Sequence, residues 1–256
     1  MSLHVAWISH APVKGLAVRQ LDQCDLTEAG ILGDREFFLV DENDRLVNSK
    51  GLGVLQQIVP RYDREASSLT LAFPDGTTVS QDVGFNGSLA ARFWSETVEV
   101  RVVDGPWSEA ISDFACRAVR LVWAPAPAPD RRRSGAATLL GTGSLQALAR
   151  ILGVEEVDER RFRMNFGIDG LGEHEEDEWL GRLVRLGEAA VVPQGNVGRC
   201  AVTTQNPDTG APDLETLKAL ASYRRVIETT EPLPFGVYAA VAHPGPVRVG
   251  DTVELA

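Results

Sequence analysis

Residues 198–210 read Gly-Arg-Cys-Ala-Val-Thr-Thr-Gln-Asn-Pro-Asp-Thr-Gly. The segment places one thiol, Cys200, directly after Arg199 and shortly before a pair of threonines. A neighbouring cation favours the thiolate, which is the form of cysteine that binds metals and attacks as a nucleophile. The glycine-containing approach at 195–198 would let a ligand come close to the backbone. Although a free cysteine is most often a small core side chain, these neighbours make Cys200 a candidate site residue.

The sequence on both sides of this segment has the pattern of a mainly β protein. Asp75-Gly76 between two apolar runs predicts a hairpin over residues 68–81. Alternating valines over residues 97–102 predict a half-buried strand. Further strands are expected over 161–169, 183–186, 189–192, 200–204, 237–242 and 247–255, and short helices over 107–119, 144–152 and 213–224. Several strands without long helices between them predict barrels or sandwiches, so the expected fold class is mainly β with a few short helices (α+β).

An Ala-Pro run at 124–129 divides the chain. Alternating proline cannot contribute to a sheet ladder and favours an extended linker. We therefore expect an N-terminal domain over residues 1–122, a linker over 123–137 and a C-terminal domain over 138–256.

The overall charge and the cysteine count limit the class of protein. The formal net charge of -11 over 256 residues argues against nucleic acid and anionic membranes as partners. The three cysteines form no CxxC pair, and the N-terminus lacks the pattern of a signal peptide, so we expect a cytoplasmic protein. The acidic run at 173–178 and the basic run at 131–133 are expected to be solvated loops.

Familiar catalytic motifs are missing from the chain. It contains no GxSxG, Walker loop, GxGxxG or HExxH sequence, and its four histidines are scattered. The residues alone therefore point to Cys200 without deciding whether it is a ligand, a nucleophile or a core side chain.

Several segments in order resemble a known family. They are Phe-Arg-Met-Asn at 162–165, Glu-Asp-x-Trp at 176–179, the Arg-Cys to Asp-Thr-Gly element at 199–210, and Val-Gly-Asp-Thr-Val at 249–253. These segments resemble the MOSC domain, which is named for the C-terminal domain of molybdenum cofactor sulfurase. Pro-Val-Lys-Gly at 12–15 and Gly-Asp-Arg at 33–35 are similar to the β-barrel domain that precedes MOSC in the mitochondrial amidoxime-reducing component and its bacterial relatives.

The resemblance implies two β-barrel-like domains and a molybdenum cofactor, a single molybdenum-bearing pyranopterin. Carried over by motif, Cys200 is the metal ligand and catalytic residue, since soft thiolate suits such a metal. Lys14 and Arg35 match positions that hold the cofactor's phosphate, and Arg163 and Asn165 match a run near the pterin. Two further residues complete the expected cofactor-binding set, Arg199 and Thr203. Pyridoxal phosphate binding, which also occurs at the family level, is not expected here.

The function implied is reduction of small N-hydroxylated compounds, with electrons from a separate iron–sulfur, flavin or cytochrome-type donor protein, because the cofactor carries the redox chemistry. The chain departs from the family pattern at Met164, at 197–198 and at 134–137. These departures leave the substrate class open. Three alternatives therefore stay open: sulfur transfer through a Cys200 persulfide, a non-catalytic cofactor carrier, and a MOSC fold that has lost the cofactor and binds another small molecule.

Overall fold

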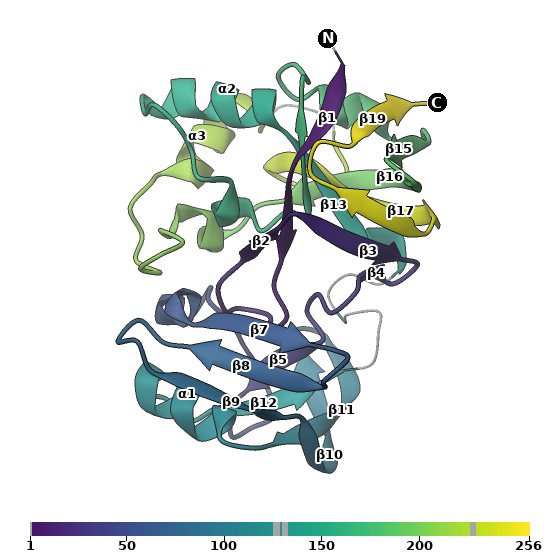
Figure 1. The fold of residues 1–256 in the computed structure, drawn as a ribbon. Helices are drawn as coiled ribbons and strands as arrows, with labels where there is room; N and C mark the ends of the chain where they lie inside the picture. Colours follow the sequence, from purple (N-terminus) through teal and green to yellow (C-terminus); the bar gives the residue numbers. More distant parts are fainter. Residues whose placement is uncertain (1, 125–128, 130–132, 226–228) are drawn as a thin grey trace.

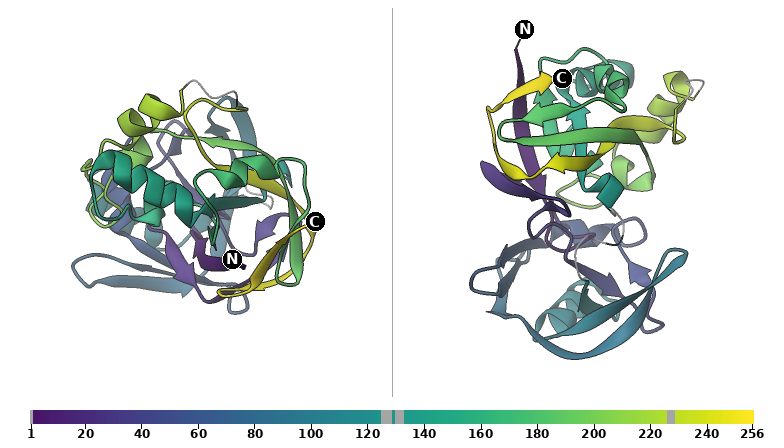
Figure 2. Two further views of the ribbon diagram at one scale, coloured as in Figure 1. Left: turned by 90° about the horizontal axis from the view of Figure 1, so that it is seen from above. Right: turned by 90° about the vertical axis from the view of Figure 1, so that its right-hand side faces the viewer.

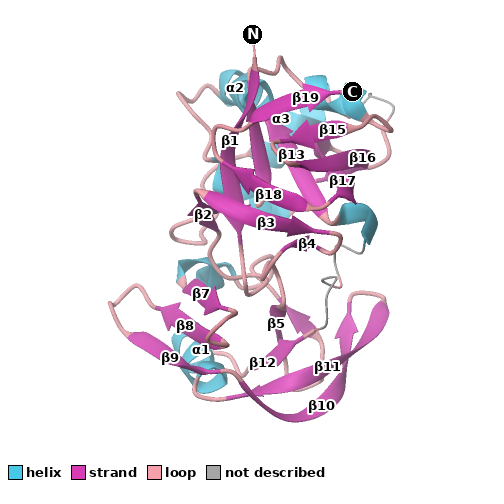
Figure 3. Cartoon of the chain, turned by 45° about the vertical axis from the view of Figure 1, so that its right-hand side comes forward, coloured by secondary structure: helices cyan, strands magenta, loops and turns pink. Residues whose placement is uncertain are grey.

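The computed structural model describes residues 2–124, 129, 133–225 and 229–256, which form two stacked β-rich parts (Figure 1). The upper part in that view holds both termini, and the lower part holds the strands between residues 37 and 123. Strands dominate both parts and the helices are few and short (Figure 3). This arrangement confirms the predicted fold class, mainly β with two barrel-like domains.

Within the described residues, seven strands of the upper part close into a barrel. Their order is β14-β13-β17-β16-β15-β19-β1, and β1 pairs with β14 to complete the ring. The strands are β1 (Leu3–His10), β13 (Ala137–Gly141), β14 (Phe166–Asp169), β15 (Val184–Leu186), β16 (Ala189–Gly198), β17 (Pro234–His243) and β19 (Thr252–Leu255). Apolar side chains from these strands fill the interior, as in other small barrels.

The N-terminal segment of the chain belongs spatially to the barrel. Beyond β1, a short strand β2 (Arg19–Leu21) pairs with β1. A separate three-stranded sheet combines β3 (Gln23–Thr27), β4 (Gly30–Ile31) and β18 (Gly245–Arg248). The division predicted along the chain, 1–122 and 138–256, therefore does not separate the two sheet systems in space, because residues 3–31 pair with C-terminal strands. The predicted domain boundaries along the chain stay a prediction.

The lower part contains two antiparallel sheets that share one apolar core. One has the order β10-β11-β12-β5-β6 and the other the order β7-β8-β9. The strands are β5 (Phe37–Val40), β6 (Leu46–Val47), β7 (Val59–Asp63), β8 (Ser68–Ala72), β9 (Thr78–Asp82), β10 (Gly84–Phe93), β11 (Glu96–Asp104) and β12 (Arg120–Trp123). Helix α1 (Trp107–Ala115) closes this core, where the Trp107 indole donates a hydrogen bond to the Leu69 carbonyl 3.0 Å away.

Two helices cover one end of the barrel, α2 (Thr142–Leu152) and α3 (Thr216–Tyr223), as the view from above in Figure 2 shows. As expected from the sequence, Gly153 ends α2 in the left-handed conformation with φ 70°. Five 3₁₀ turns connect the described elements: η1 (Gly53–Gln57), η2 (Arg133–Gly135), η3 (Glu159–Phe162), η4 (Glu175–Trp179) and η5 (Ala201–Thr204). Among the residues that the structure describes, no helix has the length and apolar character needed to cross a bilayer.

Two strand predictions were wrong near the segment that carries Cys200. Residues 200–204 form η5 because the hydroxyls of Thr203 and Thr204 bond to carbonyls three residues earlier, an alternative to a sheet ladder. Of residues 161–169, only the second half is a strand. Asp158 accepts a hydrogen bond from the Arg160 amide and starts η3 instead, and Arg163 then reverses the chain at φ 54°.

The structure also places two features that the sequence left open. The glycine-containing segment 195–198 is the end of β16. Of the other two cysteines, Cys24 is buried and Cys116 is exposed. The acidic run is not uniformly solvated, since Glu176 is fully buried. Residues 125–128 and 130–132, which include most of the Ala-Pro run and of the basic run at 131–133, lie outside the described residues.

Candidate functional site

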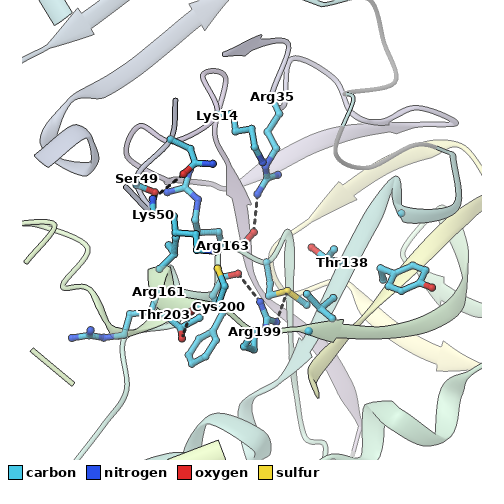
Figure 4. A pocket seen from close by; sticks show the side chains of 18 of the residues that line it. Lys14, Arg35, Ser49, Lys50, Thr138, Arg161, Arg163, Arg199, Cys200 and Thr203 are labelled. Carbon is cyan, nitrogen blue, oxygen red and sulfur yellow. Dashed lines mark hydrogen bonds between the residues drawn. The ribbon is translucent and has the colours of Figure 1, made fainter. Parts of the chain in front are cut away.

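A cleft of about 620 Å³ lies between the two parts of the molecule. Both parts contribute side chains, so the site exists only when the chain halves are packed together. Its lining includes six cationic residues, Lys14, Arg35, Lys50, Arg161, Arg163 and Arg199, together with Cys200 and Thr203 (Figure 4). A cleft lined with cations in a chain of net charge -11 is suited to an anionic ligand.

Cys200 is exposed to the cleft at the junction of β16 and η5. Its backbone carbonyl accepts hydrogen bonds from both the amide and the hydroxyl of Thr203, each 3.1 Å long. The same hydroxyl lies 2.8 Å from that of Thr216, which is fully buried at the start of α3. The turn that presents the thiol is thus anchored to a helix rather than being a free loop.

Arg199 anchors the other side of the thiol. Its guanidinium donates to the carbonyl of Phe162 at 3.0 Å and to that of Phe235 at 2.9 Å, and approaches the Met164 sulfur at 3.0 Å. Burial lowers the pKa of Arg199 to about 9, partly opposed by Cys200 and Glu176, so the group stays cationic at neutral pH. Because these donors are used within the protein, Arg199 positions the Cys200 turn. The expected contact between Arg199 and a cofactor stays a prediction, and so does the expectation that Arg199 favours the thiolate form of Cys200.

Met164, one of the departures from the family pattern, has a local explanation. Its sulfur contacts Arg199, and its terminal methyl packs where a β-carbon on Gly236 would be 2.7 Å away. A flexible thioether suits this irregular gap. Met164 therefore changes the packing around Arg199, the residue next to Cys200.

Arg35 and Arg163 bring the two parts together. The Nη2 atom of Arg35 donates to the Arg163 carbonyl at 2.9 Å, and Nη1 bonds to Asp34 at 2.5 Å. Both arginines adopt left-handed backbones, with φ of 55° and 54°. Such conformations are unfavourable for residues other than glycine and collect at functional sites. Both arginines therefore line the cleft from backbone conformations that the chain maintains at a cost.

Asp34 is the buried centre of this arrangement. Besides Arg35, its carboxylate accepts hydrogen bonds from the Ala11 amide at 2.7 Å and the Asn165 amide group at 3.2 Å. Burial alone would raise the pKa of Asp34, but Arg35, His10 and these hydrogen bonds hold it below its usual value. The carboxylate is consequently charged at neutral pH and fixes Arg35 electrostatically.

Asn165 does not line the cleft. It is buried, and its side chain bonds to the Thr138 hydroxyl at 3.1 Å and to the Ser9 carbonyl at 3.2 Å. Thr138 itself faces the cleft. Asn165 therefore acts on the site through Thr138 and Asp34.

Lys14 lies at the end of the cleft formed by the lower part. Its ammonium is 5.1 Å from the centre of the Trp94 ring and 5.6 Å from that of Phe93. Such cation–π contacts orient a lysine while leaving it charged. The lysine is thereby held at the cleft rim.

Sequence reasoning assigned no role to several residues that line the cleft. They are Ser49, Lys50, Trp94, Arg161, Glu231 and Tyr238. Ser49 and Lys50 end a segment that also resembles the family, and Arg161 adjoins the segment at 162–165, so proximity to these motifs was an available signal. Arg161 bonds to Asp213 at 2.6 and 2.8 Å and so mainly fixes the loop after η5. Nothing in the sequence marks Trp94 or Glu231.

Behind the Cys200 turn lies a buried acid that sequence reasoning also missed. The Glu176 carboxylate is fully buried, and the Ser144 hydroxyl lies 2.7 and 2.9 Å from its two oxygens. Burial raises the pKa of Glu176 to about 7, with the Ser144 hydrogen bond opposing that shift. Glu176 is therefore a titratable group close to neutral pH, although it does not reach the cleft.

Comparison with known proteins covers both parts. Residues 2–116 match the model of the MOSC N-terminal beta barrel domain, and residues 132–254 match that of the MOSC domain. Mitochondrial amidoxime-reducing component 1 of Mus musculus is 38% identical over 105 residues, 39% of this chain and 30% of that protein. Molybdenum cofactor sulfurase of Drosophila grimshawi is 30% identical over 246 residues, 89% of this chain and 30% of that protein.

The matches thus span about 30% of the length of these relatives. Among solved structures, the YUAD protein from Bacillus subtilis covers 100% of this chain with a TM-score of 0.51 at 15% identity, and 96% of that chain is covered. At this identity the likeness concerns the fold alone.

Proposed function

Because this chain belongs to the MOSC domain proteins that carry a MOSC N-terminal β-barrel domain, we propose that it binds a molybdenum cofactor through Cys200 and reduces N-hydroxylated compounds. The observation that carries the proposal is the exposed Cys200 thiol opening into a cleft lined by cations from both parts. A soft thiolate and phosphate-binding cations in one cavity form the donor set that a phosphorylated metal–dithiolene cofactor requires.

The residues present fit such a group by their chemistry. Lys14 and Arg35 would hold the phosphate, because ammonium and guanidinium groups bind phosphate oxygens strongly. Arg163, beside Arg35, would hold the pterin end, and Thr138 and Thr203 provide hydroxyls along the cleft. Cys200 would be the protein's ligand to the metal. When bound, the cofactor would supply the two-electron redox chemistry of the reduction.

The chain's own contribution is to bind, orient and supply polar groups. Glu231 lies against Gly198, where a β-carbon would be 3.3 Å from its Oε2 atom. Gly198, part of the departure at 197–198, thus makes room for a carboxylate beside the Cys200 turn. Glu231 and Tyr238 can therefore hydrogen-bond an N–OH group that enters the cleft.

The electrons would come from a separate protein. Reducing an N–OH group to N–H consumes two electrons and two protons and releases water. The three cysteines of the chain include no iron–sulfur motif. We propose a partner of iron–sulfur, flavin or cytochrome type, a small N-hydroxylated substrate and a cytoplasmic location.

The test compares two exposed cysteines in protein made by a host that synthesises the cofactor. Cys200→Ser should lose nearly all bound molybdenum and pterin and all reductase activity toward benzamidoxime with a chemical reductant. Cys116→Ser, the matched control, should keep its molybdenum, its pterin and its activity, because the Cys116 thiol is exposed outside the cleft. Unchanged metal and activity in Cys200→Ser would refute the proposal.

Sulfur transfer is a second candidate, favoured by the sulfurase relative, whose match covers 89% of this chain. In that case the exposed Cys200 would carry a persulfide. Intact-protein mass spectrometry then predicts a reducible mass increase of one sulfur that Cys200→Ser abolishes, with no pterin bound. A third possibility, a cofactor carrier, would instead show bound pterin and metal without turnover of benzamidoxime.

A further inference from the structure

A second hollow of about 270 Å³ lies beside the main cleft. It is lined by Arg45, Leu46, Arg92 and Trp94, and Trp94 also lines the main cleft. The indole therefore borders both cavities. A ligand that fills the cleft up to Lys14 meets this ring next, because the Lys14 ammonium is 5.1 Å from its centre.

Trp94 is presented to solvent by its backbone. It occupies the turn between β10 and β11 in a left-handed conformation with φ 56°, and 61% of its surface is exposed. The preceding residue, Phe93, is buried in the adjacent core. An exposed tryptophan held in an unfavourable conformation beside a cavity suits a stacking surface for a planar ring.

Arg45 and Arg92 supply positive charge at the same place. They are neighbours through an isolated β-bridge, and both are exposed. Neither makes an ion pair or a side-chain hydrogen bond within the part of the chain that the structure describes. The nearby acids are engaged elsewhere: Asp44 pairs with Arg120, and Asp41 lies 3.8 Å from Arg117. These two guanidinium groups are therefore available to an anion.

We propose that Arg45, Arg92 and Trp94 bind a nucleoside phosphate at the rim of the cleft. Arginine binds phosphate oxygens through paired N–H groups, and an aromatic side chain stacks on any base. A simple anion would use the arginines but not the indole, whereas the three side chains together match a phosphate joined to a planar ring. The ligand could be a free nucleotide or a nucleotide joined to the cofactor's phosphate; only the latter source rests on the proposed function.

The binding test uses calorimetry on the full chain at low salt with guanosine 5′-monophosphate, cytidine 5′-monophosphate and inorganic phosphate. At least one nucleotide should bind ten times more tightly than phosphate. Trp94→Ala should weaken nucleotide binding at least fivefold and leave phosphate binding unchanged, while Trp94→Phe should retain most of the affinity. The double variant Arg45→Ala with Arg92→Ala should weaken the binding of both nucleotide and phosphate. The control Arg182→Ala, at an exposed residue, should weaken the binding of neither.

Two results would overturn the proposal: nucleotides that bind no more tightly than phosphate, or an unchanged affinity in Trp94→Ala. The source is decided by acid hydrolysis of the small molecules released from protein made in a cofactor-synthesising host. If nucleobase is released in proportion to pterin, the nucleotide is joined to the cofactor. If pterin is released without nucleobase and added nucleotide binds, the ligand is a free nucleotide. Nucleotide binding without any pterin would support this site while contradicting the proposed function.

Discussion

Arg35, in the connection between β4 and β5, donates a 2.9 Å hydrogen bond to the backbone carbonyl of Arg163, which precedes barrel strand β14. The contact joins two segments 128 residues apart and sets two cations along one cleft. Cations placed together in this way repel each other unless an anion or a buried carboxylate compensates. Asp34 is that carboxylate, and it makes the cleft ready for an anionic ligand.

Asp34→Asn should destabilise the protein. The Asp34 and Arg35 side chains are 3% and 8% exposed, so neutralising the acid leaves a buried guanidinium without its counter-charge. Removing one partner of such a pair costs about 3 kcal/mol. Urea unfolding measures the loss. Asp41→Asn is the control, because the Asp41 and Arg117 side chains are 18% and 46% exposed and their ion pair is longer, at 3.8 Å; it should cost at most about 1 kcal/mol.

Arg199→Lys should lower molybdenum content while Cys200 remains in place. Lysine keeps the charge but cannot reach the Phe162 and Phe235 carbonyls simultaneously as the planar guanidinium does. The Cys200 turn should then lose one of its two anchors. Metal analysis per folded protein is the measurement, and a full molybdenum content in this variant would show that Arg199 does not position the thiol.

Glu176 should make stability fall as pH rises from about 4.5 to about 7. Its folded pKa is raised from 4.5 to about 7 by burial, so in this window the folded state binds more protons than the unfolded state. Deprotonation of the folded form then costs stability, up to on the order of 3 kcal/mol above pH 7.

Glu176→Gln should flatten this pH dependence, because the amide cannot ionise but can still meet the Ser144 hydroxyl. Unfolding midpoints measured between pH 4 and 8 provide the comparison. A stability profile of the same slope in the variant would assign the pH dependence to other groups.

Gly53→Ala should weaken the packing between the two parts. A β-carbon at Gly53 would lie 2.1 Å from the Gly210 carbonyl oxygen, and this contact is between backbones that cannot simply rotate away. We expect a loss of about 2 kcal/mol, in the range of overpacking substitutions. Gly51→Ala is the control, because nothing lies within 4 Å of the β-carbon there. Equal thermal stability of the two variants would contradict the close contact.

Local patterns were sufficient for much of this fold. Asp75-Gly76 correctly predicted the hairpin of β8 and β9, and Gly153 correctly predicted the end of α2. Strand prediction was wrong at 200–204, where threonine hydroxyls bond to local carbonyls and compete with sheet formation. The pairing of β1 with β14 was beyond reach for a different reason, because it joins residues more than 150 positions apart.

Of the site residues named from motifs, all but the buried Asn165 line the same cleft. The residues that were missed depend on tertiary structure. Glu176 reads as part of a solvated acidic run until α2 brings Ser144 over it. Likewise, Trp94 reads as a strand end until the β10–β11 turn meets the cleft beside Lys14.

The most direct test of the central claim is X-ray absorption at the molybdenum edge of the purified protein. If Cys200 is the metal ligand, the small amount of molybdenum that Cys200→Ser retains should have one fewer sulfur neighbour than molybdenum in the unmodified chain, while Cys116→Ser should match the unmodified chain. An identical number of sulfur neighbours in Cys200→Ser and the unmodified protein would contradict the claim.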